Sequence, residues 1–129
     1  MRNFNKAKNF YKNTEKSSIQ SQDPIAIVKN MVGELKRSMD KVITSTGVDS
    51  QRQFRAKYFS RSLVIIYTLQ TTLDFEKEEN LAAKLFQLYE FCRQQLIKCF
   101  REQVVDGVKK AMNALEEIFI INTMSKNER

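Results

Sequence analysis

The sequence predicts an all-α fold: an antiparallel four-helix bundle with a loosely ordered N-terminal segment. Glycine (3 residues) and proline (1 residue) are scarce, so the chain has little turn material for a sheet of many strands. Apolar residues recur three, four or seven positions apart in successive segments, as in helices that each bury one face. Helices joined by short links pack best as antiparallel neighbours, and 129 residues with 42% hydrophobic content suffice for one domain with a core.

Both ends of the chain are predicted to lie outside the bundle. We divide the sequence into an N-terminal tail of residues 1–22, a helical bundle of residues 23–124 and a polar tail of residues 125–129. The N-terminal tail lacks the apolar region of a signal peptide, and no run of 18 apolar residues predicts a membrane span. We therefore expect a cytoplasmic protein.

The first helix is expected to begin at Asp23-Pro24 and to end at Gly47. Asp is a favoured N-cap, Pro suits the first helical position, and Gly suits the left-handed residue after a helix. The predicted apolar face contains Ile27, Val28, Met31, Leu35, Met39, Val42 and Ile43.

The second helix is expected to begin near Ser50, because Ser50 and Gln53 have the spacing of a capping box. The β-branched residues 64–66 would suit a strand, but the pattern around them has a helical period. The predicted apolar side contains Phe54, Tyr58, Ser62, Ile65, Leu69 and Leu73, broadened by Phe59, Leu63 and Ile66.

The third helix is expected to span residues 73–99. Four carboxylates at positions 74, 76, 78 and 79 crowd its predicted first turn, where the helix dipole favours negative charge. Its apolar stripe contains Leu81, Leu85, Leu88, Tyr89, Cys92, Leu96 and Cys99. The fourth helix is expected to follow a break at Asp106-Gly107, with a face of Val108, Ala111 or Met112, Leu115, Ile118 and Phe119.

No pattern in the chain indicates catalysis or a cofactor. Histidine is absent, the glycines are isolated, and no Ser or Cys has an evident base partner. Cys92 and Cys99 lie seven residues apart on one predicted helix, which separates their Cα atoms by about 10 Å, beyond disulfide reach. We expect two reduced core cysteines, no metal site, no cofactor and no enzymatic activity.

Two other functions remain open, one suggested by the formal net charge of +7 and the other by apolar surface beyond what one core needs. One is a basic helical module that binds nucleic acid, which would need Arg52, Arg55, Lys57 and Arg61 on one continuous face. Because the chain lacks helix-turn-helix punctuation, zinc spacing and an aromatic RNA-binding motif, we expect a solvated basic face instead. The other is a structural bundle that self-associates; the sequence does not predict the oligomeric state.

A specific motif runs through residues 73–99. A Leu-Asp pair is followed by a Glu, an aliphatic-Ala pair, a Leu-Tyr pair and a distant Leu, namely Leu73-Asp74, Glu76, Leu81-Ala82, Leu88-Tyr89 and Leu96. This order, kept without a gap, resembles the third helix of the flagellar secretion chaperone family, FliS. Weaker similarities at Phe10-Tyr11, Pro24 and residues 115–119 extend the resemblance over most of the chain.

Several positions depart from the pattern of that family. Residues 31–34 read Met-Val-Gly-Glu where the family often has Leu-Tyr-Asp-Gly, and Phe119 replaces a final Trp. Glu78-Glu79 stand in place of the usual glycines, and Cys99-Phe100 in place of an Ala-Asn pair. These differences indicate a divergent member.

The resemblance implies a cytoplasmic chaperone that binds the C-terminal segment of flagellin and keeps it from polymerising before export. The flagellar export apparatus is a further expected partner. A client segment that is disordered alone can fold as an amphipathic helix in apolar grooves between bundle helices. In the family the N-terminal tyrosine region can occupy part of the empty client site, which makes the tail of this chain a candidate cap. The client-binding candidates are Phe10, Tyr11, Phe59, Leu63, Phe86, Tyr89, Phe91, Phe119, Ile120 and Ile121.

Overall fold

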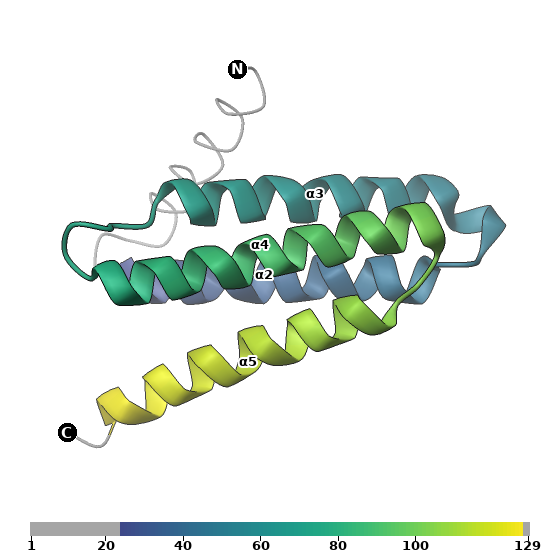
Figure 1. The fold of residues 1–129 in the computed structure, drawn as a ribbon. Helices are drawn as coiled ribbons and strands as arrows, with labels where there is room; N and C mark the ends of the chain where they lie inside the picture. Colours follow the sequence, from purple (N-terminus) through teal and green to yellow (C-terminus); the bar gives the residue numbers. More distant parts are fainter. Residues whose placement is uncertain (1–23, 128–129) are drawn as a thin grey trace.

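The computed structural model describes the backbone of residues 24–127 and the side chains of residues 24–119. This part of the chain forms an up-down-up-down bundle of α2 (Pro24–Ser45), α3 (Arg52–Thr71), α4 (Glu79–Glu102) and α5 (Asp106–Asn127), which is visible in Figure 1. No strand occurs within these residues. The prediction of an all-α antiparallel four-helix bundle is therefore confirmed, while the predicted N-terminal tail and the N-cap at Asp23 lie outside the described residues.

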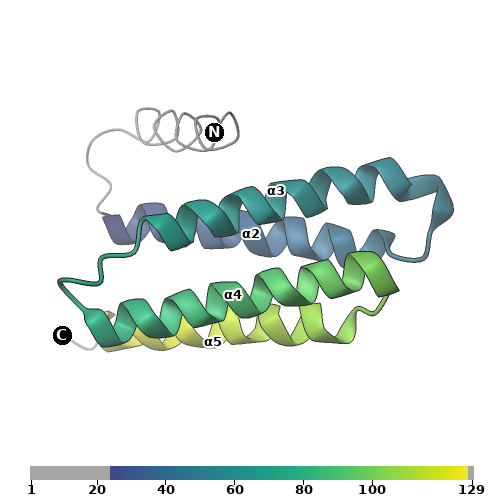
Figure 2. The ribbon, with the colours of Figure 1, turned by 45° about the horizontal axis from the view of Figure 1, so that its top comes forward.

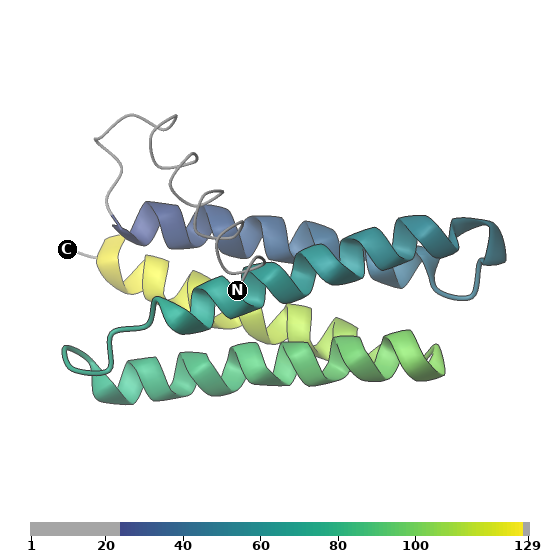
Figure 3. The ribbon, with the colours of Figure 1, turned by 90° about the horizontal axis from the view of Figure 1, so that it is seen from above.

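The helices form a closed ring of neighbours. α2 packs against α3, α3 against α4, α4 against α5, and α5 returns to α2. Figures 2 and 3 show the same arrangement from two further directions. The start of α2 and the link between α3 and α4 lie at one end of the bundle, whereas the α2–α3 and α4–α5 links lie at the other.

One hydrophobic core runs between the four helices. Each predicted stripe contributes to it, because residues three or four positions apart lie on the same side of a helix. Burial of this apolar surface stabilises the fold by about 25 cal/mol for each Å² removed from water. The core residues are Met31, Val32, Leu35, Met39, Val42, Ile65, Ile66, Leu69, Leu88, Tyr89, Cys92, Leu96, Cys99, Val108, Ala111 and Leu115.

Two residues of the predicted stripes are exposed instead of buried. Phe54 lies in the first turn of α3 with 40% of its surface exposed, and Leu81 lies in the first turn of α4 with 37% exposed. The ends of helices have fewer neighbours than their middles, so periodicity alone overstates burial there. At the start of α4 the adjacent Ala82 is buried in the place predicted for Leu81.

The link between α2 and α3 confirms one predicted signal and corrects another. Gly47 has a φ of +85°, as expected for the residue that follows a helix. The predicted capping box of Ser50 and Gln53 does not form, because Asp49–Gln51 make a short 3₁₀-helix, η1, and α3 begins only at Arg52 without a side-chain cap. The 3₁₀-helix thus leads directly into α3, and no described side chain accepts a capping hydrogen bond from the first N–H groups of α3.

α4 begins at Glu79, six residues later than predicted. The Asp74 carboxylate accepts hydrogen bonds from the backbone N–H groups of Glu76 (3.1 Å) and Lys77 (3.2 Å). A short polar side chain that binds its own following backbone competes with the helix and favours a turn. The helix therefore starts at Glu79, and three of the four predicted first-turn carboxylates belong to the link.

The break between the last two helices also lies earlier than predicted. α4 ends at Glu102, and Gln103 adopts a left-handed conformation with a φ of 59° and donates its N–H to the carbonyl oxygen of Cys99 (2.8 Å). Asp106 and Gly107 are the first residues of α5. A Cβ at Gly107 would lie 1.8 Å from Oε1 of Gln95 on α4, so a larger residue there would require the Gln95 side chain to move.

The two cysteines are buried in the core, as predicted. Cys92 and Cys99 are 0% and 1% exposed, and neither is in a disulfide. Burial raises the pKa of the Cys92 thiol to about 12, because an apolar environment disfavours the thiolate. No helix within the described residues is long and apolar enough to cross a membrane.

Candidate protein-binding surface

Exposed aromatic residues gather where α3 and α4 lie side by side. Phe59 of α3 stacks on Phe100 of α4, with ring centroids 4.2 Å apart and planes tilted by 13°. Nearer the other end of the bundle, Phe75 of the α3–α4 link contacts Phe86 of α4 at 6.3 Å. We call this surface the α3–α4 seam and define it by Phe59, Leu63, Gln70, Phe75, Phe86, Glu90, Arg93, Ile97 and Phe100.

The apolar side chains of the seam are more accessible than a core requires. Phe75, Phe86 and Phe100 are 44%, 37% and 38% exposed, and Phe59 and Leu63 are half-buried. Scattered exposed apolar residues are ordinary on a protein surface, whereas several gathered on one surface mark an interaction site. The seam is therefore a candidate protein-binding surface.

A polar bridge joins α3 to α4 between the two aromatic pairs. Nε2 of Gln70 donates to Oε1 of Glu90 (3.2 Å) and to the backbone carbonyl oxygen of Phe86 (3.4 Å). Arg93 donates from Nε and Nη2 to the same Glu90 carboxylate at 2.5–3.1 Å. The hydrogen bonds from Arg93 and then Gln70 lower the pKa of Glu90 to about 2, so Glu90 is ionised at neutral pH.

Helix periodicity explains which side chains reach the seam. The buried residues Ile65, Ile66 and Leu69 define the side of α3 that faces the core. Phe59 and Leu63 are four positions apart and lie together on the flank of that side. On α4 the buried residues define the core side in the same way, which leaves Phe86 and Phe100 on the flank nearest α3. Side chains that flank a stripe are half covered by the neighbouring helix and half open to water.

The structure brings three predicted client-binding candidates together and separates others. Phe59, Leu63 and Phe86 share the seam. Phe91 is also exposed (37%), but it follows Phe86 by five residues, a rotation of about 140° around α4, and lies away from the seam. Phe119 of α5 is half-buried and packs against the core.

Tyr89 is a correction to the predicted set. Its side chain is 1% exposed and belongs to the core, where burial raises the pKa of its phenol. A buried side chain cannot contact a client unless the bundle opens, so we remove it from the candidates. Phe10, Tyr11, Ile120 and Ile121 lie outside the residues whose side chains are described.

Two aromatic residues of the seam, Phe75 and Phe100, were not among the predicted candidates. Phe100 follows Phe86 by fourteen residues, and this repeat of the heptad spacing on one helix was the available signal. Phe75 stands among acidic residues of a link whose path the sequence does not reveal. Its contact with Phe86 depends on the turn at Asp74.

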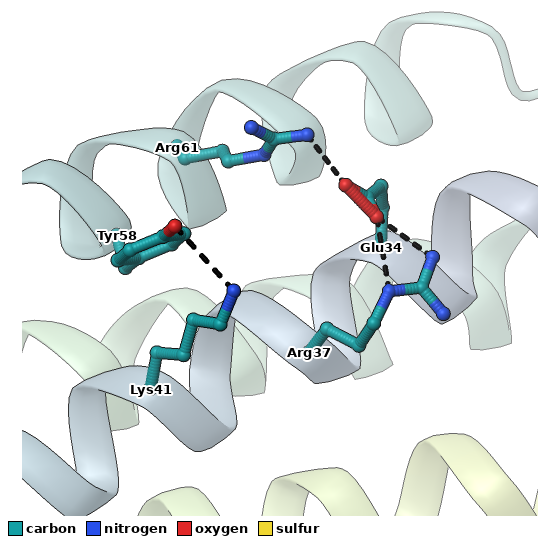
Figure 4. Close-up of polar contacts among 5 residues, drawn as sticks. All are labelled: Glu34, Arg37, Lys41, Tyr58 and Arg61. Atoms are coloured by element: carbon teal, nitrogen blue, oxygen red, sulfur yellow. Dashed lines mark hydrogen bonds and ion pairs between the residues drawn. The ribbon is translucent and has the colours of Figure 1, made fainter.

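The opposite side of α3 carries polar contacts with α2, drawn in Figure 4. Glu34 accepts hydrogen bonds from Arg37 (2.7 Å) and from Arg61 of α3 (2.5 Å), and Nζ of Lys41 lies 3.4 Å from the Tyr58 hydroxyl. The arginines, Arg37 foremost, hold the pKa of Glu34 below its usual range. The Glu34–Arg61 and Lys41–Tyr58 contacts join α2 to α3.

The continuous basic face required for nucleic-acid binding does not form. Arg55 is only 9% exposed and donates from Nη1 to the backbone carbonyl oxygens of Ser45 and Val48. Arg61 is engaged by Glu34. Of the predicted basic set, only Arg52 and Lys57 remain on the exposed surface of α3.

A comparison with protein families gives a match over nearly the whole chain. The family model described as "Flagellar protein FliS" matches residues 7–120, which include the entire seam. No curated protein and no solved structure matches the chain. The motif of residues 73–99, the four-helix bundle and the extent of the family match agree, and the chain therefore belongs to the FliS family of flagellar chaperones.

Proposed function

We propose that this protein is a cytoplasmic export chaperone that binds the disordered C-terminal segment of flagellin at the α3–α4 seam. In this role it prevents premature polymerisation and delivers its client to the flagellar export apparatus. The observation that carries the proposal is the cluster of accessible aromatic side chains on a chain of the FliS family.

The physical basis is the folding of an amphipathic segment against a prepared surface. A disordered client loses conformational entropy when it becomes helical, so its apolar face must bury a large area to compensate. The seam offers aromatic groups near both of its ends, supplied by α3, by α4 and by Phe75 of the link between them. The apolar face that would otherwise join filament subunits is covered while the client is bound.

The N-terminal tail supplies a further element of the proposal. Phe10 and Tyr11 are large apolar groups in a basic, polar segment, and they are the counterpart of the tyrosine region that caps the empty client site in the family. We assign them the role of a removable cover of the client surface. If a cover competes with the client, the apparent association constant equals the intrinsic constant multiplied by the fraction of molecules that are uncovered.

Titration calorimetry with the C-terminal segment of flagellin from the same organism tests the main proposal. Wild-type protein is compared with Phe86→Ser in the seam and with Val64→Ser on α3, whose side chain is equally accessible (38% exposed) but is not a seam residue. We expect Phe86→Ser to weaken binding at least tenfold, since loss of one aromatic anchor costs about 2 kcal/mol or more. Val64→Ser is expected to bind like wild type.

Two results would contradict the proposal. Wild-type protein that fails to bind the flagellin segment would exclude the client, and equal effects of the two serine variants would exclude the seam as the site. Light scattering on the same samples separates client binding from self-association, because a seam buried between two copies would appear as a doubled mass that Phe86→Ser abolishes.

A further inference from the structure

Three residues form a straight row along the seam side of α4. Phe86, Arg93 and Phe100 are seven positions apart, and seven residues turn a helix by only about 20° less than two full turns. The row therefore extends about 21 Å along α4, with the arginine midway between the two rings. The Phe86 and Phe100 side chains are 37% and 38% exposed, and that of Arg93 is 42% exposed.

Arg93 is held in place and still has hydrogen-bonding capacity. Its Nε and Nη2 atoms donate to Glu90, and Glu90 is itself fixed by Gln70 of α3. A guanidinium group has five N–H donors in a rigid plane, and no hydrogen bond from Nη1 of Arg93 is made within the described residues. The bridge thus orients a cation on the seam without using all of its donors.

We propose that this row recognises a helical client segment that carries two apolar anchors fourteen residues apart and a carboxylate midway between them. The inference rests on the proposed function and specifies which client sequence the seam selects. The two rings receive the apolar anchors, and Arg93 receives the carboxylate through its remaining N–H groups. The net charge of +7 on the chain also favours an acidic partner over a basic one.

The position of the arginine makes it a determinant of specificity. Once a client helix covers the row, water leaves the space between the two anchors, and the N–H groups of Arg93 that Glu90 does not bind lose their acceptors, which costs free energy. A client carboxylate removes this penalty and forms charge-assisted hydrogen bonds. A client with the right anchors but a lysine or an apolar residue at the midpoint supplies no acceptor for these N–H groups and is consequently bound more weakly.

Charge reversal with a matched control tests the proposal. Arg93→Glu is compared with Lys98→Glu, which changes charge by the same amount on an exposed residue of α4, about 140° of rotation away from Arg93. Each variant is titrated with the flagellin C-terminal segment and with a neutral version in which every Asp and Glu is replaced by Asn and Gln. We expect Arg93→Glu to weaken binding of the native segment more than tenfold, and Lys98→Glu by less than twofold.

The Lys98→Glu control separates a local contact from a general effect of charge, and the neutral segment separates an effect of client charge from structural damage caused by the substitution. If Arg93 contacts a client carboxylate, the loss caused by Arg93→Glu shrinks to a few-fold with the neutral segment, as a double-mutant cycle requires. Equal losses for Arg93→Glu and Lys98→Glu, or an unchanged loss with the neutral segment, would overturn the row but leave client binding in place. Failure of wild-type protein to bind either segment would overturn the proposed function together with this inference.

Discussion

Arg55, in the first turn of α3, donates a hydrogen bond from Nη1 to the backbone carbonyl oxygen of Ser45, the last residue of α2. A second bond from the same atom reaches the carbonyl oxygen of Val48 (3.3 Å). The last carbonyl groups of a helix have no partner within it, and a cation is favoured at that end of the helix dipole. One arginine thus caps α2 and fastens the link to α3.

Replacement of Arg55 by methionine is expected to destabilise the bundle. The variant keeps a long apolar stem but loses both hydrogen bonds from a charged donor, which costs about 1.5–3 kcal/mol, although the two carbonyl oxygens still accept from the backbone N–H groups of Val48 and Gln51. Urea unfolding followed by circular dichroism measures the change. Arg52→Met, at an exposed position of the same helix, is the control and is expected to change the free energy of unfolding by less than about 0.5 kcal/mol.

Truncation of a fully buried core side chain is expected to cost more. Leu96 is 0% exposed, so Leu96→Ala removes apolar contacts and leaves a cavity, at a cost of about 2–5 kcal/mol. Leu81→Ala on the same helix removes the same atoms from a side chain that is 37% exposed and is expected to cost much less. Similar losses for the two variants in chemical denaturation would show that the core is placed wrongly.

The polar bridge makes a small part of the stability dependent on acid. The folded pKa of Glu90 is about 2, below its ordinary value of 4.5, so the unfolded chain takes up the proton first as pH falls. This contribution is fully present above about pH 4.5 and is lost as pH falls from there through about 2. Wild type should exceed Glu90→Gln in stability at pH 7, and thermal melts should show the difference shrinking across that interval. A difference that grew with acidification would contradict the assigned hydrogen bonds.

The two cysteines are expected to be unreactive in the folded protein. Burial excludes reagent from both thiols, and the pKa of Cys92 near 12 leaves almost no thiolate at neutral pH. A disulfide-exchange dye should therefore label them only at the rate of unfolding, and both should react at once in denaturant. Rapid labelling of native protein would show that α4 opens locally.

Removal of residues 1–20 tests the proposed cover. The described bundle begins at Pro24, so we expect the truncated protein to keep its helical content and melting behaviour while its affinity for the flagellin segment changes. Calorimetry of full-length and truncated protein gives the comparison, and Phe10→Ser with Tyr11→Ser in the full chain separates the aromatic groups from the charge of the tail. Identical affinities for all three proteins would end the idea of a cover.

Much of the bundle follows from local sequence, because a helix has a fixed period. The stripes containing Leu35, Leu69, Leu96 and Leu115 identify the buried faces, and Gly47 and Pro24 mark ends that local backbone chemistry decides. The first residue of α4 was misplaced for an equally local reason, since Asp74 binds the two N–H groups that follow it. The amino-acid composition of a segment gives only a weak indication that a side chain will bind backbone N–H groups in place of a helical turn.

The seam depends on the tertiary structure. Phe59 and Phe100 are 41 residues apart, and only the antiparallel register of α3 and α4 stacks them. Arg55 and Tyr89 show the same limit. Arg55 was predicted on a basic face and is a buried cap of α2, and Tyr89 was predicted to contact the client and lies in the core. Both are buried because neighbouring helices cover them. By itself the sequence determined the helices, their buried faces and the family. Which flanking side chains share a surface was decided by packing, since that depends on the rotation and register of each helix against its neighbours.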